Sequence, residues 1–107
     1  MIDDTLFIKT FGDSPALKVL MFLLENNIFD YPKTEIARNV HISRTTLNTF
    51  WDEFVKRGII KKTRSIGRAT FYQIDMGNQI VKKTNALNNV ICKAYSNDLV
   101  EPVSVPA

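Results

Sequence analysis

The sequence of 107 residues has little of what metal binding and most catalysis require. It contains a single cysteine, Cys92, and a single histidine, His41. One cysteine excludes an intramolecular disulfide and a thiolate metal cluster within one chain. The four glycines are scattered along the chain, so no glycine-rich loop is present to cradle a phosphate. We therefore expect no enzyme, no cofactor and no metal, with Cys92 a small buried hydrophobe and His41 filling a turn.

Long apolar runs are also missing, since no stretch approaches the roughly 20 residues that cross a bilayer. The first residues, MIDDTLFIKTF, are acidic where a secretory signal would be basic. A hydrophobic fraction of 45% is ordinary for one small globular domain. We expect no membrane partner and a cytoplasmic location, nucleoid-associated if the source is prokaryotic.

Positive charge is concentrated in one part of the chain. Residues 33 to 83 include eleven basic and four acidic residues, a net charge of +7, whereas the two flanks together carry −4. A local basic field attracts phosphates, because each neutralised phosphate releases condensed counterions. A solvated basic surface without a partner would have the same composition, so charge alone leaves both interpretations open.

The chain divides into four expected segments: an N-terminal arm (1–13), a folded domain (14–77), a C-terminal helix (78–96) and a flexible tail (97–107). The domain begins with GDSPALKVLMFLLENN, in which Ser14 suits the N-cap and Pro15 the first helical position. This helix is so apolar that we expect it to be buried on most sides. One small chain can hardly cover it completely, so we expect a second subunit or a returning C-terminal helix to contribute.

Two further helices and a hairpin follow. KTEIARNV predicts a brief helix, and Ser43 suits the N-cap of a longer one that ends at Gly58. The apolar stripe of the longer helix is Leu47, Phe50, Trp51, Phe54 and Val55. The β-prone runs IIKKT and ATFYQI flank RSIGR, which predicts a hairpin with Gly67 at its tip. The expected fold is mainly α with a small β-hairpin: helix, short strand, helix, longer helix, two-stranded hairpin and C-terminal helix.

The last helix repeats apolar residues at the spacing of a coiled-coil seam. Two heptads are too few for a free coiled coil, so the seam must pack on the domain, on a second copy, or on both. We expect a homodimer whose interface combines this seam with the first helix: Leu17, Leu20, Met21, Ile80, Thr84, Leu87, Ile91 and Ala94.

A short helix, a tight bend, a longer helix and a basic hairpin are the order of a helix-turn-helix followed by a wing. A helix fits the B-DNA major groove, which is about 12 Å wide. Short polar side chains on the outer face of the longer helix can donate to and accept from base edges: Ser43, Thr45, Asn48 and Thr49. Arg44 can reach guanine or phosphate. The hairpin adds four basic residues, Lys61, Lys62, Arg64 and Arg68.

The stretch ISRTTLNTFWDEFVKRGII resembles the recognition-helix region of MarR- and ArsR-type winged-helix transcription regulators. FGDSPALKVLMFLLEN and EIARNVHIS are similar to the first helix and the second helix with its turn in such regulators, including archaeal ones. The resemblance implies Ser43, Arg44, Thr45, Thr46, Asn48 and Thr49 at the groove, Arg64 and Arg68 on the wing, and Lys33 near phosphate. Pro32 departs from the capping Ser or Thr of many relatives, and Cys92 and His41 cannot supply an ArsR-type metal cluster.

The expected function is sequence-specific binding of double-stranded DNA as a transcription regulator, with the recognition helix in the major groove and the wing on the backbone or minor groove. Two alternatives remain open. Winged helices also serve as protein-interaction modules, and an architectural DNA-binding protein would have the same basic surface but little sequence preference.

Overall fold

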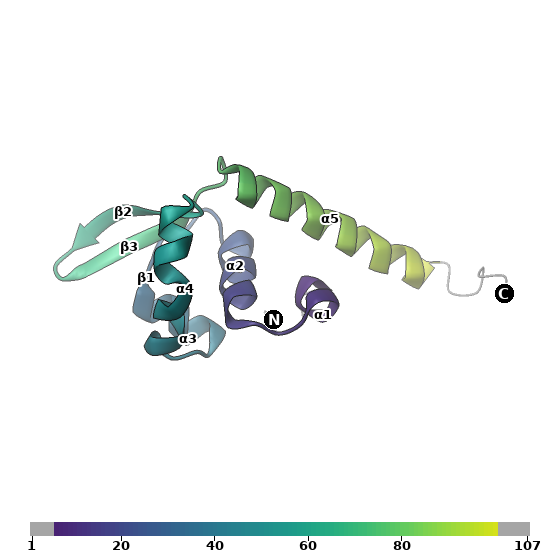
Figure 1. Cartoon of the computed structure of the whole chain (residues 1–107). Helices are drawn as coiled ribbons and strands as arrows, with labels where there is room; N and C mark the ends of the chain where they lie inside the picture. Colours follow the sequence, from purple (N-terminus) through teal and green to yellow (C-terminus); the bar gives the residue numbers. More distant parts are fainter. Residues whose placement is uncertain (1–5, 101–107) are drawn as a thin grey trace.

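The computed structural model describes residues 6–100, and the side chains of residues 6–97. The elements in this range are α1 (Leu6–Phe11), α2 (Pro15–Glu25), β1 (Tyr31–Pro32), α3 (Lys33–Val40), α4 (Arg44–Lys56), β2 (Ile60–Ile66), β3 (Ala69–Ile74) and α5 (Gln79–Val100) (Figure 1). This order is that of a winged helix-turn-helix, which confirms the predicted fold class. Helix α1 falls within the expected N-terminal arm.

Helix α2 is the centre of the hydrophobic core. Ser14 caps it as predicted, because its Oγ accepts from the backbone N–H of Leu17 at 3.1 Å, and Pro15 opens the helix. All six residues from Val19 to Leu24 are buried. Their cover comes from the same chain, since α1, α3, α4 and β3 all pack on α2. Of the two expected sources of cover, the C-terminal helix contributes Val81 and Ile91 to the same buried cluster, and the burial of Val19 to Leu24 requires no second subunit.

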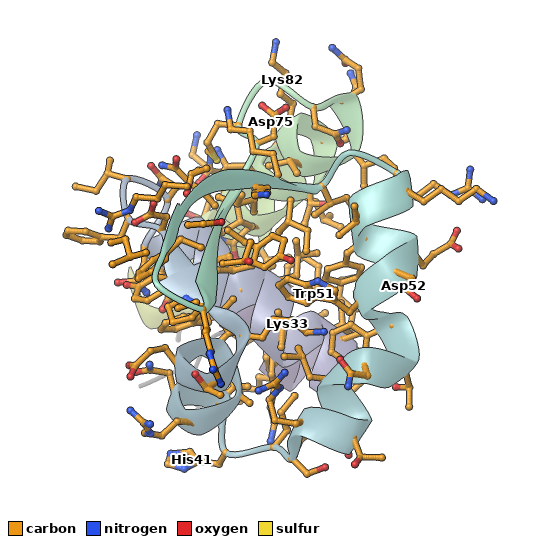
Figure 2. All side chains as sticks on the ribbon, turned by 90° about the vertical axis from the view of Figure 1, so that its left-hand side faces the viewer. Lys33, His41, Trp51, Asp52, Asp75 and Lys82 are labelled. Atoms are coloured by element: carbon orange, nitrogen blue, oxygen red, sulfur yellow. The ribbon has the colours of Figure 1, made fainter. Side chains whose placement is uncertain are left out.

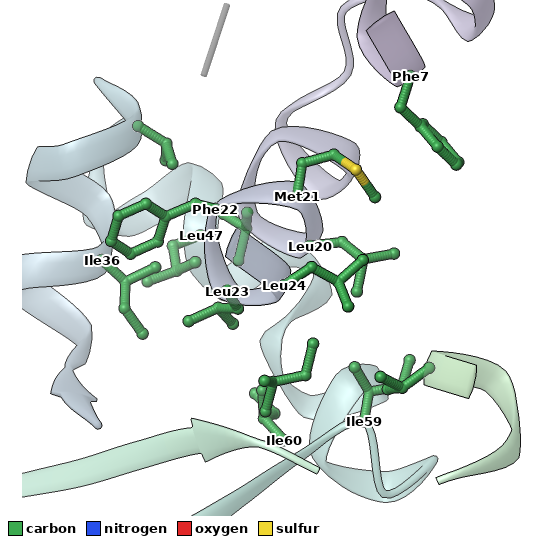
Figure 3. Close-up of a cluster of buried hydrophobic side chains, with 14 of the residues drawn as sticks. Phe7, Leu20, Met21, Phe22, Leu23, Leu24, Ile36, Leu47, Ile59 and Ile60 are labelled. Carbon is green, nitrogen blue, oxygen red and sulfur yellow. The ribbon is translucent and has the colours of Figure 1, made fainter. Parts of the chain in front are cut away.

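The core extends from α2 into the helix-turn-helix. Figure 3 shows Phe22, Ile36 and Leu47 close to one another beside α2, with Ile59 and Ile60 on its other side. Ile36 and Leu47 are completely shielded from solvent. They come from α3 and α4, so their burial holds those two helices against α2 at a fixed angle. Burying such side chains contributes roughly 1.5–3 kcal/mol each.

The turn between α3 and α4 forms as the sequence predicts. His41 ends α3 in the left-handed conformation, with φ 60°, and its side chain is exposed. Ser43 caps α4, because its Oγ accepts from the backbone N–H of Thr46 at 3.0 Å. The apolar stripe of α4 is narrower than predicted, since Leu47 and Trp51 are buried but Val55 is 43% exposed.

The wing is a hairpin of β2 and β3 that belongs to a three-stranded antiparallel sheet in the order β1-β3-β2. The sequence predicted the two-stranded wing and a short strand before it, but not their pairing, in which Tyr31 lies opposite Tyr72. Gly67 lies at the tip with φ 61°, a backbone conformation that glycine adopts without strain. A register shift between Lys62 and Arg64 marks a β-bulge at Thr63.

Helix α5 extends away from the domain on the side opposite the wing (Figure 1). Asn78 fixes its start: the side-chain Oδ1 accepts from the backbone N–H of Ile80 at 2.9 Å, and Nδ2 donates to the carbonyl of Arg57 at 2.9 Å. The helix continues to Val100, past the expected end at residue 96, and residues 101–107 of the expected tail lie outside the described residues. Within residues 6–100, none of the helices combines the length and apolar character that crossing a membrane requires.

Helix α1 packs along α5. Phe7 and Ile8 share one buried cluster with Val81 and Ile91, and the hydroxyls of Thr10 and Tyr95 lie 3.3 Å apart. Of the residues expected at a dimer interface, Leu20, Met21 and Ile91 are buried inside the subunit and Leu17 and Thr84 are half-buried. Ile80, Leu87 and Ala94 remain exposed. Cys92 is exposed as well, so the expectation of a buried thiol was wrong.

Candidate nucleic-acid interface

The outer face of α4 presents a small set of polar side chains. Arg44, Thr45 and Asn48 are exposed, and none of the side-chain hydrogen bonds found among the described residues uses them. The other predicted groove residues have structural roles. The Ser43 hydroxyl caps the helix and lies 3.0 Å from the Thr46 hydroxyl, while the Thr49 hydroxyl donates to the carbonyl of Thr46 at 2.6 Å.

Two adjoining hollows separate α4 from the wing, and we call them together the basic cleft. The first, about 390 Å³, is lined by Pro32, Lys33, Thr34, Arg44, Arg68, Ala69, Thr70 and Tyr72. The second, about 490 Å³, is lined by Lys33, Trp51, Asp52, Val55, Lys56, Lys62 and Tyr72. The first hollow has three cationic side chains and no carboxylate in its lining. The basic cleft is therefore a surface that suits an anion.

Lys33 lies where the two hollows meet. It is the first residue of α3, after Pro32, which occupies the N-cap without a side-chain hydrogen bond. Its ammonium nitrogen lies 5.2 Å from the centroid of the Trp51 ring, a cation–π arrangement. Figure 2 shows Lys33 and Trp51 between the wing and α4. Trp51 in turn meets Tyr72 edge to face, with ring centroids 4.9 Å apart.

The pKa of Lys33 is lowered in the basic cleft, chiefly because the side chain is partly buried. Partial burial lowers the pKa of its ammonium group, and the positive charge of Arg44 lowers it further, while Asp52 acts in the opposite direction. A bound anion would relieve the repulsion between these two cations and raise the pKa of Lys33 towards its ordinary value. Lys33 and Arg44 thus lie close enough in the first hollow for each to disfavour the charge of the other.

The wing's basic residues divide between its two faces. Arg68 lines the first hollow and Lys62, opposite Tyr72 in the sheet, lines the second. Lys61 pairs with Gln73 instead, and neighbouring strand residues point to opposite faces, so Lys61 faces away from the cleft.

Arg64 is not the free cation that the sequence predicted. It binds the carboxylate of Asp30 through Nε at 2.9 Å and Nη2 at 3.0 Å. This contact lies on the face of the wing that points away from the basic cleft, whereas Tyr72 lies on the cleft face. The predicted contact between Arg64 and DNA therefore has no support in its geometry.

Sequence reasoning missed several lining residues of the basic cleft, namely Thr34, Lys56, Thr70 and Tyr72. The alternation of a strand places Thr70 and Tyr72 on one face, which was readable from the sequence. The sequence does not show which face of the strand turns towards α4, because that depends on tertiary packing. No group of three or more metal-ligating side chains occurs in the part of the chain that the structure describes.

The sequence matches no protein-family model, and no curated protein matches it significantly. Solved structures do resemble it. A double mutant of ZitR from Lactococcus lactis has a TM-score of 0.57 and 16% identity, over 76% of this chain and 57% of that one. The same ZitR mutant in apo form has a TM-score of 0.60 and 15% identity, over 90% of this chain and 74% of that one. The adhesin competence repressor AdcR from Streptococcus pyogenes has a TM-score of 0.58 and 14% identity, over 92% of this chain and 75% of that one.

These similarities show the winged helix-turn-helix fold. The chain spans only a little over half the length of the first ZitR structure, and at these identities membership of the MarR or ArsR type stays a prediction. The neighbours give no support to the expectation that the chain binds no metal, because an apo form of ZitR implies a ligand-bound form of that protein.

Proposed function

We propose that this chain binds double-stranded DNA as a transcription regulator, with α4 in the major groove and the wing over the adjacent backbone. The observation that carries the proposal is the basic cleft, where Lys33, Arg44 and Arg68 line one hollow without a carboxylate. A phosphodiester is the anion that recurs beside a groove-bound helix, and phosphate contacts fix the register of a protein on the duplex. The name of the repressor AdcR, which shares this fold, agrees with the proposal.

The face of α4 next to the basic cleft supplies the groups for base recognition. Asn48 is exposed, and its amide has the donor and acceptor that match the N7 and N6 edge of adenine. Thr45, one turn earlier, is exposed and can contact a base or a thymine methyl group. Ser43 and Thr46 contribute by holding the first turn of α4 in place through their hydroxyls.

Asn48→Ala is expected to reduce the preference for a specific duplex by about 5- to 150-fold, since one bidentate base contact discriminates by roughly 1–3 kcal/mol. The specific duplex is first selected from a random pool by the parent protein. Fluorescence anisotropy then compares it with a scrambled duplex of the same length. Asn89→Ala, on the exposed face of α5, is the matched control. If the pool yields no preferred sequence, the protein is an architectural binder; if it yields no bound DNA, the protein-interaction alternative gains.

We further propose that two copies pair through α5. Ile80, Leu87, Val90 and Ala94 are exposed along one side of this helix, at spacings of seven, three and four. An exposed apolar stripe of this length is unusual in a monomer and typical of an interface. Pairing would present two copies of α4 to half-sites about 34–36 Å apart, so the selected duplex should be palindromic.

Leu87→Glu is expected to convert the dimer to a monomer, because it places a charge in the middle of the stripe without a partner. Light scattering after size exclusion, at tens of micromolar protein, measures the mass. Asn89→Glu introduces the same charge on the opposite side of α5 and should remain dimeric. A parent protein that is already monomeric at this concentration would contradict the pairing.

A further inference from the structure

The β-bulge at Thr63 redirects one side chain of the wing. In a regular strand, Lys62 and Arg64 would point to the same face, towards α4. The extra residue changes the register, so that Lys62 lies opposite Tyr72 and Arg64 lies opposite Phe71. Arg64 consequently leaves the cleft side of the wing, and its guanidinium carbon lies 4.5 Å from the centroid of the Phe71 ring on the far side.

On that far side Arg64 meets a carboxylate from another part of the chain. Asp30, directly before β1, accepts two hydrogen bonds from the guanidinium, and a third from the Thr63 hydroxyl at 2.5 Å. The hydrogen bond from Arg64, and then that from Thr63, hold the pKa of the Asp30 carboxyl below its ordinary value. The Asp30 side chain is only 19% exposed, whereas that of Arg64 is 54% exposed. Two-point binding of this kind fixes orientation as well as distance.

Strand β3 is held to the domain by its pairing with β1 and by the contact of Tyr72 with Trp51, whereas the outer part of β2 has no buried side chain. Every residue from Lys61 to Arg68 is exposed, and only Ile60 and Ile74 at the base of the hairpin are buried. The segment that carries Asp30 directly follows α2 and is also bound to β3 of the wing, because the Gln73 side chain donates to the carbonyl of Asn27 at 2.8 Å. The contacts of Asp30 therefore connect the exposed part of β2 to the end of the central helix α2.

We propose that Asp30, Thr63 and Arg64 form a clasp that holds the wing at the angle at which Arg68 and Lys62 face α4 across the basic cleft. Arg64 is then a positioning residue that does not contact DNA. The consequence for DNA binding rests on the proposed function, whereas the effect on the wing of the free protein does not. The clasp sets the distance between the wing, which is proposed to bind the DNA backbone, and α4, which is proposed to bind the bases.

Asp30→Asn separates the clasp from a direct role of Arg64, because the two ideas predict effects of opposite sign. If Arg64 contacted DNA, removing its carboxylate partner would release a cation and tighten binding. The clasp predicts instead that the selected duplex binds about tenfold more weakly, the scale of one lost charge-assisted hydrogen bond. Glu25→Gln removes the same charge from the exposed end of α2 and is the matched control.

Amide hydrogen exchange of the free protein measures how firmly the wing is held, without any DNA present. In Asp30→Asn, exchange should accelerate in β2 and in the facing part of β3, while α2 and α4 stay as protected as in the parent. Unchanged exchange in the wing, or tighter binding of the selected duplex, would overturn the clasp. If the parent binds no duplex and wing exchange still rises in the variant, the proposed function fails and the clasp stands.

Discussion

Replacing Lys33, Arg44 and Arg68 together by glutamine is expected to weaken binding to any DNA duplex roughly a hundredfold at about 0.15 M salt. The three side chains line one hollow and come from α3, α4 and the wing, so no single element supplies the site. Each phosphate contact contributes about 0.9 to the slope of log K against log salt concentration. Losing three contacts should therefore make that slope shallower by about 2.7.

The measurement is a salt titration by fluorescence anisotropy, on both the selected and the scrambled duplex. Both should weaken to the same degree, because phosphate contacts carry no sequence information. The control replaces Lys82, Lys83 and Lys93 of α5 by glutamine, which changes the net charge by the same amount at exposed sites that do not line the basic cleft. A slope that falls equally in the control would mean that overall charge, and not the basic cleft, attracts the DNA.

Trp51→Ala is expected to lower the free energy of unfolding by about 3–5 kcal/mol, the usual cost of removing a buried tryptophan. Trp51 is 3% exposed, contacts Tyr72 edge to face, and lies beneath the Lys33 ammonium group. It therefore joins α4, β3 and the start of α3 at one point. A domain of this size has a total stability of only about 5–15 kcal/mol, so the variant should be close to unfolding at physiological temperature.

Urea denaturation followed by circular dichroism measures this loss. Val55→Ala, on the same helix but 43% exposed, should change the free energy of unfolding by less than about 0.5 kcal/mol. Trp51→Phe keeps an aromatic ring against Tyr72 and should recover part of the stability. A loss below about 1 kcal/mol in Trp51→Ala would show that the ring cluster is not a structural centre of the domain, contrary to its burial.

Local signals made the helix-turn-helix predictable. Ser14, Ser43 and Gly58 mark helix ends through hydrogen bonds or backbone conformations that depend only on adjacent residues, and the structure confirms each. The hairpin around Gly67 is predictable for the same reason. The polar face of α4 also follows from its period, although the sequence did not show that Ser43 and Thr46 would bond to each other.

The features that sequence reasoning missed depend on distant parts of the chain. Arg64 was expected on the wing together with Arg68, and only the register against β3 reveals the bulge that turns Arg64 away from the basic cleft. The cover of α2 was expected from a second subunit or the C-terminal helix because the packing of α1, α3, α4 and β3 on α2 depends on residues far apart in the sequence. Cys92 was expected to be buried beside Ile91, yet α1 covers Ile91 and leaves its neighbour in solvent.

Asn78 connects the end of α4 to the start of α5. One side chain both starts α5 and bonds to the carbonyl of Arg57, the residue that ends α4. The start of α5 is thus held against the end of α4 by this amide, beside a backbone hydrogen bond from Asp75 to Ile59. A rotation of α5 would therefore move α4 with it. If two copies pair through α5, the angle between their α5 helices would set the distance between their two α4 helices.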